Sequence, residues 1–447
     1  MGLTQELAGF IASLEYPRIP AQGIEAVKRG TADCLGVLFC GRNEPVVGAV
    51  QGFLRTSGNA EAHVLYDRGF ASAPEAALIN ATAGHALDYD DTSLDGHPSV
   101  VLVPTLLAEG ERLRANGKEL ICAYVAGYET WVELSLRDRD RHHDKGWHPT
   151  AVFGTLACAA AAARIARLDA TGTTRALGIA ASMTSGVVAN FGSMMKPLQV
   201  GRAAQNGMLA ARLAAAGITA APDALEHPSG LLRAISPSGR VRTDGPIATG
   251  REWAIERYGI NIKRYPVCYA LHRAIDAALE LRTEHRIDAD AVETVEVTLG
   301  PAQTRMLRNH RPRTGLDAKF SAEFAMASVF IAGHIGMREL RDAFVASAAV
   351  QQFMDRVRIT TIEQMDPEDP VFSIHDWVTV RMRDGTRFES RKVRHARGHA
   401  RNPGKPEEQK AKFDDCVGDA LGVAARDRLF ERLVRLDDLA ETAALYA

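Results

Sequence analysis

The sequence predicts a mainly α protein made of a large all-helical domain and a smaller α+β domain, inserted before the C-terminal helices. A chain of 447 residues is too long for one ordinary hydrophobic core, so two domains are expected. Up to about residue 250, apolar residues recur at helical spacing and no convincing strand is found. Beyond that point alternating runs typical of strands appear, and the tail returns to a helical pattern. We place the all-helical domain at 1–255, completed by 400–447, and the α+β domain at 256–399.

The helical domain is expected to centre on one helix of small residues. The segment 149–167 carries mostly Ala, Gly, Thr and Cys on one side, which allows close approach of neighbouring backbones. Helical spacing predicts further helices at 3–15, 22–40, 44–57, 74–86, 104–115, 118–137, 171–190 and 201–216.

The α+β domain is predicted from three alternating runs and one turn signal. The runs cover 292–299, 356–362 and 377–383, and the last is followed by Asp384-Gly385 and a further alternating stretch. Asp-Gly between two such runs is a strong hairpin signal. Helices are expected at 270–285, 321–333 and 337–346, and in the tail at 406–443.

Composition excludes several classes of protein. Hydrophobic residues make up 46% of the chain and charged residues 24%. The formal net charge is −2, which gives no electrostatic reason to expect binding to nucleic acid or to an anionic membrane. The six cysteines show no paired spacing, which favours a reduced intracellular chain over a disulfide scaffold or a zinc site. No secretory pattern and no uncharged membrane-length run occur, so we expect a cytoplasmic protein.

The stretch 85–99, HALDYDDTSLDGHPS, is the densest polar cluster between two apolar segments. Buried carboxylates and imidazoles are costly unless they are paired or used in chemistry, so a site is one reading. A solvated loop that caps a helix is the other. The aspartates of DDTSLD could also bind magnesium for a prenyl diphosphate, with Asp414-Asp415 as the second aspartate motif. This kind of site is disfavoured, because it needs a continuous helix and Gly96-His97-Pro98 interrupts one here. Acid–base chemistry and carboxylate binding without metal would require cations elsewhere. The polar members of the cluster are His85, Asp88, Asp90, Asp91, Thr92, Asp95 and His97.

Such cations occur in three other segments. His148 opens the small-residue helix, where the helix dipole favours an anion and lowers the pKa of an imidazole. Lys196 is the one charge in an apolar loop ahead of a helix. Three more such residues, Lys263, Arg264 and His272, lie where the purely helical pattern gives way to alternating, strand-like runs. Residues at this junction of the two expected domains are well placed to line a cleft. Each also has an ordinary structural reading, as a helix cap, a surface lysine or a packed helix residue.

Together these blocks resemble the MmgE/PrpD family, which includes 2-methylcitrate dehydratase, cis-aconitate decarboxylase and iminodisuccinate epimerase. HALDYDDT with GHPS, then GWHPTAVFG, MKPLQVGRAAQNG and RYPVCYALH, occur in the family's order and span nearly the whole chain. The resemblance implies an α+β lid over the helical domain, a site in the cleft between them, a homodimer, and neither cofactor nor metal. The site residues it implies are Asp88, Thr92, His97, His148, Lys196 and His272. Phe324 stands where many members carry a tyrosine.

We therefore expect a cofactor-independent lyase or isomerase that abstracts a proton next to a carboxylate of a small di- or tricarboxylate. Lys196 and His97, with Lys263 or Arg264, would bind carboxylates, and His148, His272 or Asp88 would be the base. A 2-methylcitrate dehydratase-like reaction is the leading version. An epimerase, favoured by Phe324 and the short segment between Thr92 and His97, and a decarboxylase are alternatives, as is a non-catalytic carboxylate-binding protein.

Overall fold

The computed structural model describes residues 2–54, 60–66, 69–369 and 371–446. It confirms a mainly α fold with a smaller α+β part. The chain divides into two compact units. The first comprises Met1–Ile262 and Lys405–Ala447, and the second comprises Lys263–Gly404.

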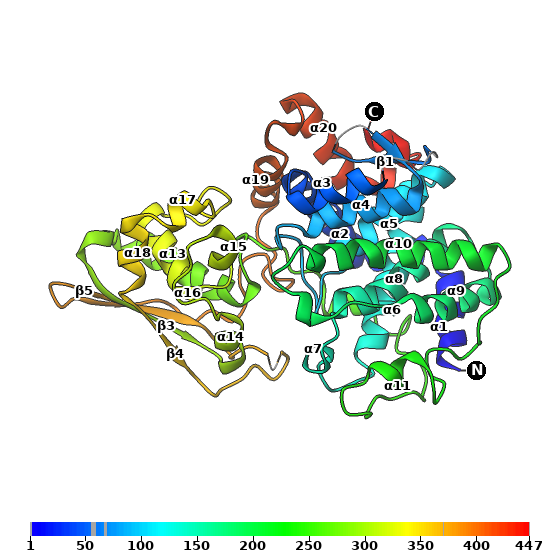
Figure 1. The fold of residues 1–447 in the computed structure, drawn as a ribbon, viewed down its shortest axis with the longest axis horizontal. Coiled ribbons are helices and arrows are strands. Elements are labelled where there is room, and N and C mark those ends of the chain that lie inside the picture. Colours follow the sequence, from blue (N-terminus) through cyan, green and yellow to red (C-terminus); the bar gives the residue numbers. More distant parts are fainter. Residues whose placement is uncertain (1, 55–59, 67–68, 370, 447) are drawn as a thin grey trace. The chain divides into compact units, whose positions relative to one another are not determined.

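The first unit is a bundle of helices around α8 (Pro149–Ile165), which is buried along almost its whole length (Figure 1). Its neighbours approach closely at glycines. A Cβ on Gly127 of α6 would lie 2.7 Å from the Ala157 carbonyl oxygen, and one on Gly207 of α10 would lie 2.5 Å from that of Thr155. The expected central helix is thus confirmed. The other long helices are α1 (Leu3–Ser13), α2 (Ala21–Gly41), α3 (Pro45–Leu54), α4 (Ala73–His85), α5 (Pro98–Leu113), α6 (Gly117–Ser135), α9 (Ala170–Met183), α10 (Met195–Ala215), α19 (Pro406–Val417) and α20 (Val423–Val434); the short ones are α7 (His142–Lys145), α11 (Leu231–Ile235) and α12 (Ala254–Arg257).

Several boundaries differ from those expected. The helix expected at 171–190 ends at Met183, because Gly186 takes a φ of +115° and its carbonyl accepts a hydrogen bond from the backbone of His148 at 3.1 Å. The helix expected from residue 104 begins at Pro98, and Pro104 lies inside it. Residues 55–57 of the expected helix 44–57 lie outside the described residues.

The expectation of no strand before residue 250 is wrong. Strands β1 (Ala62–Val64) and β2 (Gly69–Ala71) form an antiparallel pair beside α4 and α5. Each strand is only three residues long, which is too short to produce an alternating pattern in the sequence.

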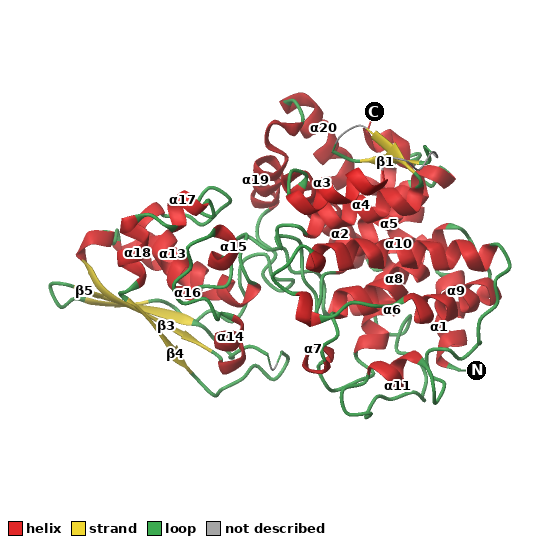
Figure 2. Ribbon diagram, in the orientation of Figure 1, coloured by secondary structure: helices red, strands yellow, loops and turns green. Residues whose placement is uncertain are grey.

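The second unit holds a four-stranded sheet in the order β4-β3-β5-β6 (Figure 2). Strand β3 (Val292–Leu299) pairs parallel with β4 (Val357–Thr361) and antiparallel with β5 (Trp377–Met382). Strands β5 and β6 (Arg387–Glu389) form the hairpin predicted at Asp384-Gly385, where Gly385 has a φ of +89°. The helices are α13 (His272–His285), α14 (Pro301–Met306), α15 (Gly315–Ala318), α16 (Ala322–Ala332), α17 (Asp342–Val345) and α18 (Ala348–Met354).

Of the helix expected at 337–346, only the single turn of α17 is helical, and the rest of the segment forms turns and bends. The tail expected as helix at 406–443 is interrupted between α19 and α20, where Gly418 takes a φ of +51°. Cys34, Cys122, Cys158 and Cys416 are buried free thiols. Within the described ranges, no helix is both long enough and apolar enough to cross a membrane.

Candidate active site

Two helices of the first unit begin at a His-Pro pair, and their N-termini meet. His97 is the N-cap of α5 and His148 the N-cap of α8, each followed by a proline in the first helical turn. The backbone N–H of His97 donates to Thr150 Oγ1 at 3.3 Å. A Cβ on Gly96 would overlap the Trp131 ring, so only glycine allows this approach. Helix N-termini carry partial positive charge, so the two ends together favour an anionic ligand.

A buried carboxylate, Asp90, holds two imidazoles. His85 Nδ1 lies 2.9 Å from Asp90 Oδ2, and His97 Nδ1 lies 3.1 Å from the same oxygen. Burial alone would raise the pKa of Asp90, but the two imidazoles hold that pKa well below its usual range. Burial lowers the pKa of His85 to about 4 although Asp90 opposes the shift, so His85 is neutral at neutral pH and donates from Nδ1.

Asp88 and Lys196 form an ion pair at the edge of this cluster. Lys196 Nζ, in the first turn of α10, lies 3.0 Å from Asp88 Oδ1, and His97 Nε2 lies 3.7 Å from the same oxygen. The lysine ammonium also lies 5.3 Å from the centre of the Phe191 ring. Asp88 has a φ of +53°, a left-handed conformation that aspartate tolerates better than most residues and that is common at functional sites.

The tautomer of His148 is fixed by Gln199. Gln199 Nε2 donates to the Val187 carbonyl at 3.1 Å, so its Oε1 faces His148 Nδ1 at 2.8 Å. An amide oxygen only accepts, so Nδ1 of His148 carries the hydrogen and Nε2 is the nitrogen left for chemistry. Burial, reinforced by His85 and Lys196, holds the pKa of His148 well below its usual range. The ring lies 4.8 Å from that of Phe191, in an edge-to-face arrangement.

The donor set also fits a metal ion by its residue types. His85, Asp88, Asp90 and His97 each offer a ligand atom within 4.8 Å of the others. The Nδ1 atoms of both histidines are engaged by Asp90, however, and the ammonium of Lys196 is already paired with Asp88. A second cation beside Lys196 would be repelled, so this arrangement is better suited to an anionic ligand than to a metal.

The second unit carries the other predicted residues. Lys263, His272 and Phe324 are buried, and Arg264 is half-buried. His272 opens α13, and its ring centre lies 5.1 Å from that of Tyr265 and 4.9 Å from that of Tyr269. Phe324, in α16, has no exposed surface and packs against Phe344 within the core of the unit.

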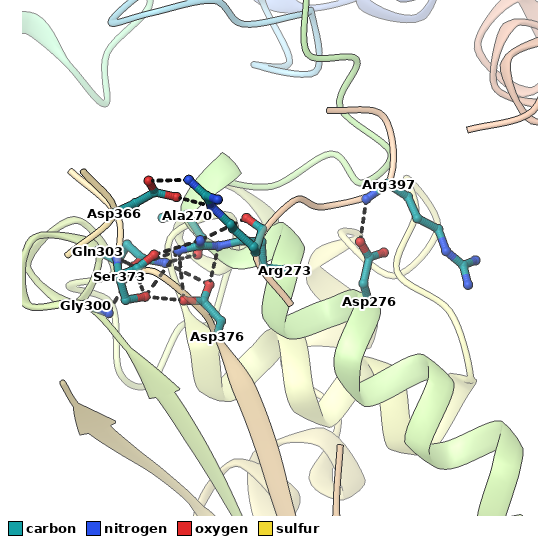
Figure 3. A network of polar contacts seen from close by, with 10 residues as sticks. Ala270, Arg273, Asp276, Gly300, Gln303, Asp366, Ser373, Asp376 and Arg397 are labelled. Atoms are coloured by element: carbon teal, nitrogen blue, oxygen red, sulfur yellow. Dashed lines mark hydrogen bonds and ion pairs between the residues drawn. The ribbon is translucent and has the colours of Figure 1, made fainter. Parts of the chain in front are cut away.

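A polar network surrounds the start of α13 (Figure 3). Arg273, the neighbour of His272, makes two hydrogen bonds of 2.9 Å to the carboxylate of Asp376, which has no exposed surface. Ser373 and Gln303 bond to both of these side chains. The network therefore fixes the helix end that carries His272.

Comparison with known proteins identifies the family. Residues 5–244 match the family model of the MmgE/PrpD N-terminal domain, and residues 265–436 match that of the MmgE/PrpD C-terminal domain. The chain belongs to the MmgE/PrpD family. It is 28% identical to cis-aconitate decarboxylase of Mus musculus, with 99% of this chain and 92% of the relative covered. The corresponding enzyme of Homo sapiens is 26% identical, with 99% and 93% covered. That of Aspergillus terreus is 25% identical, with 73% and 71% covered.

In this MmgE/PrpD chain, the structure brings together Asp88, His97, His148 and Lys196 from three segments of the first unit. Thr92 lies in the same loop, and its backbone N–H donates to the Asn261 carbonyl at 2.9 Å. The roles assigned to these residues and to Lys263, Arg264, His272 and Phe324 stay predictions.

Three residues of the cluster were not assigned roles from the sequence. His85 and Asp90 belong to the polar stretch that the sequence singled out, but their pairing depends on the fold of the loop. Gln199 follows Lys196 by three residues, so both lie on one face of α10. That spacing is the only signal in the sequence that links Gln199 to the site.

Proposed function

We propose that this chain is a lyase for a small polycarboxylate, and that it decarboxylates an unsaturated tricarboxylate similar to cis-aconitate. The observation that carries the proposal is the meeting of the Lys196 ammonium and three imidazoles with two helix N-termini. The relatives named above are all cis-aconitate decarboxylases, which supports decarboxylation over the dehydration that the sequence favoured. Dehydratase activity stays a prediction.

Carboxylate binding would use the positive groups of the cluster. Lys196 is paired with Asp88, and a substrate carboxylate can take the place of Asp88 or share the ammonium with it. The N-terminus of α5 supplies further hydrogen-bond donors, as does Nε2 of His97 in the doubly protonated form of the ring. These groups are already in place, so they also stabilise the negative charge that develops on the substrate in the transition state.

Decarboxylation would proceed by breaking the bond between a CH₂ group and its carboxylate. Carbon dioxide leaves, and the electron pair shifts through the neighbouring double bond to the carbon beside another carboxylate. A proton must then be added to that carbon.

We assign this proton to Nε2 of His148. In the free protein His148 is neutral, because burial lowers its pKa. A polyanionic substrate beside the ring would raise that pKa, so the imidazole gains a proton as the substrate binds. Because Gln199 holds Nδ1, the proton resides on Nε2 and is delivered from there.

The epimerase alternative, which Phe324 and the short segment between Thr92 and His97 favour, stays a prediction. Phe324 itself is completely buried within its own unit. The expected homodimer stays a prediction.

The test is incubation of the purified protein with a panel of di- and tricarboxylates in deuterated water, followed by mass spectrometry and measurement of carbon dioxide. We expect cis-aconitate or a close analogue to release one carbon dioxide for each deuterium incorporated at carbon. Loss of water without carbon dioxide would indicate a dehydratase. Deuterium exchange without either loss would indicate an epimerase, and tight binding without product a binding protein.

Variants test the assignment of residues. K196A and H148A should lose turnover while retaining the wild-type circular dichroism spectrum. K118A, at an exposed lysine in the first turn of α6, is the matched control and should retain full activity. A K196A variant that keeps most of its activity would remove Lys196 from the proposed mechanism.

A further inference from the structure

A buried lysine from the C-terminal tail contacts the loop that carries the site. Lys412, on α19, donates from Nζ to the Tyr89 carbonyl oxygen at 3.0 Å. The same Nζ forms an ion pair of 2.6 Å with Asp33 Oδ1 on α2, and lies 4.0 Å from the centre of the Tyr89 ring. Lys412 is 8% exposed, Asp33 3% and Tyr89 6%.

The contacted peptide stands between the two carboxylates that organise the cluster. Asp88, immediately before Tyr89, has the left-handed conformation and pairs with Lys196. Asp90, immediately after it, holds the imidazoles of His85 and His97. A rotation of the Tyr89 peptide would therefore displace both carboxylates from their partners.

Stability alone does not account for such a pair. Removing two opposite charges from water costs several kcal/mol per ion, and replacing a buried ion pair with apolar residues is often neutral or stabilising. A buried pair whose lysine also binds the backbone of the site loop is better explained by the geometry that it imposes.

We propose that Lys412 and Asp33 are positioning residues for the reaction. Asp33 orients the ammonium of Lys412, and the ammonium fixes the Tyr89 carbonyl so that Asp88 and Asp90 face their partners. The inference rests on the proposed lyase function for its kinetic consequence, but its structural consequence can be measured without turnover.

The experiment compares K412M with the double variant D33L/K412M. The single variant leaves the Asp33 carboxyl buried without its cationic partner, so we expect a large loss of stability in urea unfolding. The double variant removes both charges and should recover most of that stability. Its kcat should nevertheless stay about ten- to 100-fold below wild type, with a much smaller change in KM, because the reacting groups are misplaced. K412R keeps a cation and a donor and should restore part of kcat.

Hydrogen–deuterium exchange of the full-length protein gives the second measurement. We expect peptides from 85–99 to exchange faster in D33L/K412M, while peptides from α8 keep their wild-type protection. K410M is the matched control, because Lys410 lies on the same helix and pairs with Asp414 and Asp427 at partly exposed positions. It should change neither exchange nor kcat.

Two results would overturn the inference. In one, kcat recovers together with stability in D33L/K412M, which would make the pair purely structural. In the other, exchange of 85–99 in that variant equals wild type. If the wild-type protein turns over none of the polycarboxylates, the proposed function fails, and the exchange measurement still decides whether Lys412 positions the loop.

Discussion

Replacing Gln199 with leucine should slow turnover about 10- to 150-fold by removing the acceptor that orients His148. Leucine has a similar size but cannot accept the hydrogen bond from Nδ1, which is 2.8 Å long in this structure. A hydrogen bond to a charged group contributes about 1.5–3 kcal/mol. The protonated imidazole would lose this contribution, and each 1.36 kcal/mol corresponds to about tenfold in rate. The KM should change little, because Gln199 is not assigned to substrate binding.

The assay is steady-state kinetics of Q199L on the substrate found in the panel above, together with ¹⁵N spectra of the histidine rings. Q205L is the control, because Gln205 lies on the same helix, is also buried, and accepts a hydrogen bond from Arg202. Unchanged kcat in Q199L, or an equal loss in Q205L, would refute the role of Gln199.

The variant Q199E tests the direction of proton transfer at the same position. A carboxylate beside Nδ1 would raise the pKa of His148, which burial keeps low in wild type. If His148 donates the proton, its active form is lost as pH rises, so the basic limb of the kcat/KM profile should move to higher pH. If the acidic limb moves to higher pH instead, His148 acts as a base and our assignment is wrong.

Three further predictions concern the fold that holds the site. G96A should lower the free energy of unfolding by about 1–3 kcal/mol and reduce activity, because the new methyl group would overlap Trp131. G48A on α3 is the control, since a Cβ there has nothing within 4 Å, and it should not destabilise the protein. Urea unfolding measures both variants. R273M should lower the stability of the second unit by about 3–5 kcal/mol, because it leaves the buried Asp376 carboxyl without its cationic partner. The double variant R273M/D376L should recover most of that stability. Equal losses of stability in the single and double variants would contradict the prediction. His85 has a folded pKa of about 4 against 6.5 in the unfolded chain, so the unfolded chain binds the proton first as pH falls, and the free energy of unfolding should drop by about 3 kcal/mol between pH 6.5 and 4. The variant H85Q should lack that part of the pH dependence, and a slope identical to wild type would refute the shift.

The sequence predicted elements whose patterns are long and local. The small-residue helix at 149–167 and the hairpin at Asp384-Gly385 were found because each has its signal within a few turns or a single dipeptide. Where a boundary depends on a distant partner, the sequence was misleading. The end of α9 is set by Gly186, whose carbonyl is needed to hold the backbone of His148, and no pattern within residues 171–190 contains that requirement.

The same distinction between local signals and distant partners applies to the residues of the site. The His148-Pro149 pair could be placed at a helix start, since proline favours the first helical turn, whereas the helix that begins after His97 was expected only from residue 104. Which carboxylate meets which cation could not be predicted, because it depends on how segments distant in sequence pack together. Gln199 shows this limit most clearly, since an amide one turn after a lysine has no special meaning until His148 lies 2.8 Å away.

The density of aspartates in HALDYDDT has a physical explanation once the partners are known. Three carboxylates within four residues would repel one another in a buried loop, and each is held in a different way. Asp88 is neutralised by Lys196, and Asp90 by two imidazoles. Asp91 accepts hydrogen bonds from the backbone N–H and the hydroxyl of Ser99, and burial raises its pKa well above its usual range although Ser99 opposes the shift.

Asp88 and Lys196 carry the charges of this ion pair at partly exposed positions, where a ligand can reach them. A substrate carboxylate that draws Lys196 from Asp88 would leave Asp88 facing Nε2 of His97, which is 3.7 Å away. The imidazolium form of His97, which carries a hydrogen on Nε2 as well as on Nδ1, would then donate to the Asp88 carboxylate in place of the lysine. The Asp88–Lys196 ion pair would in this way couple binding of the anion to the arrangement of the imidazoles.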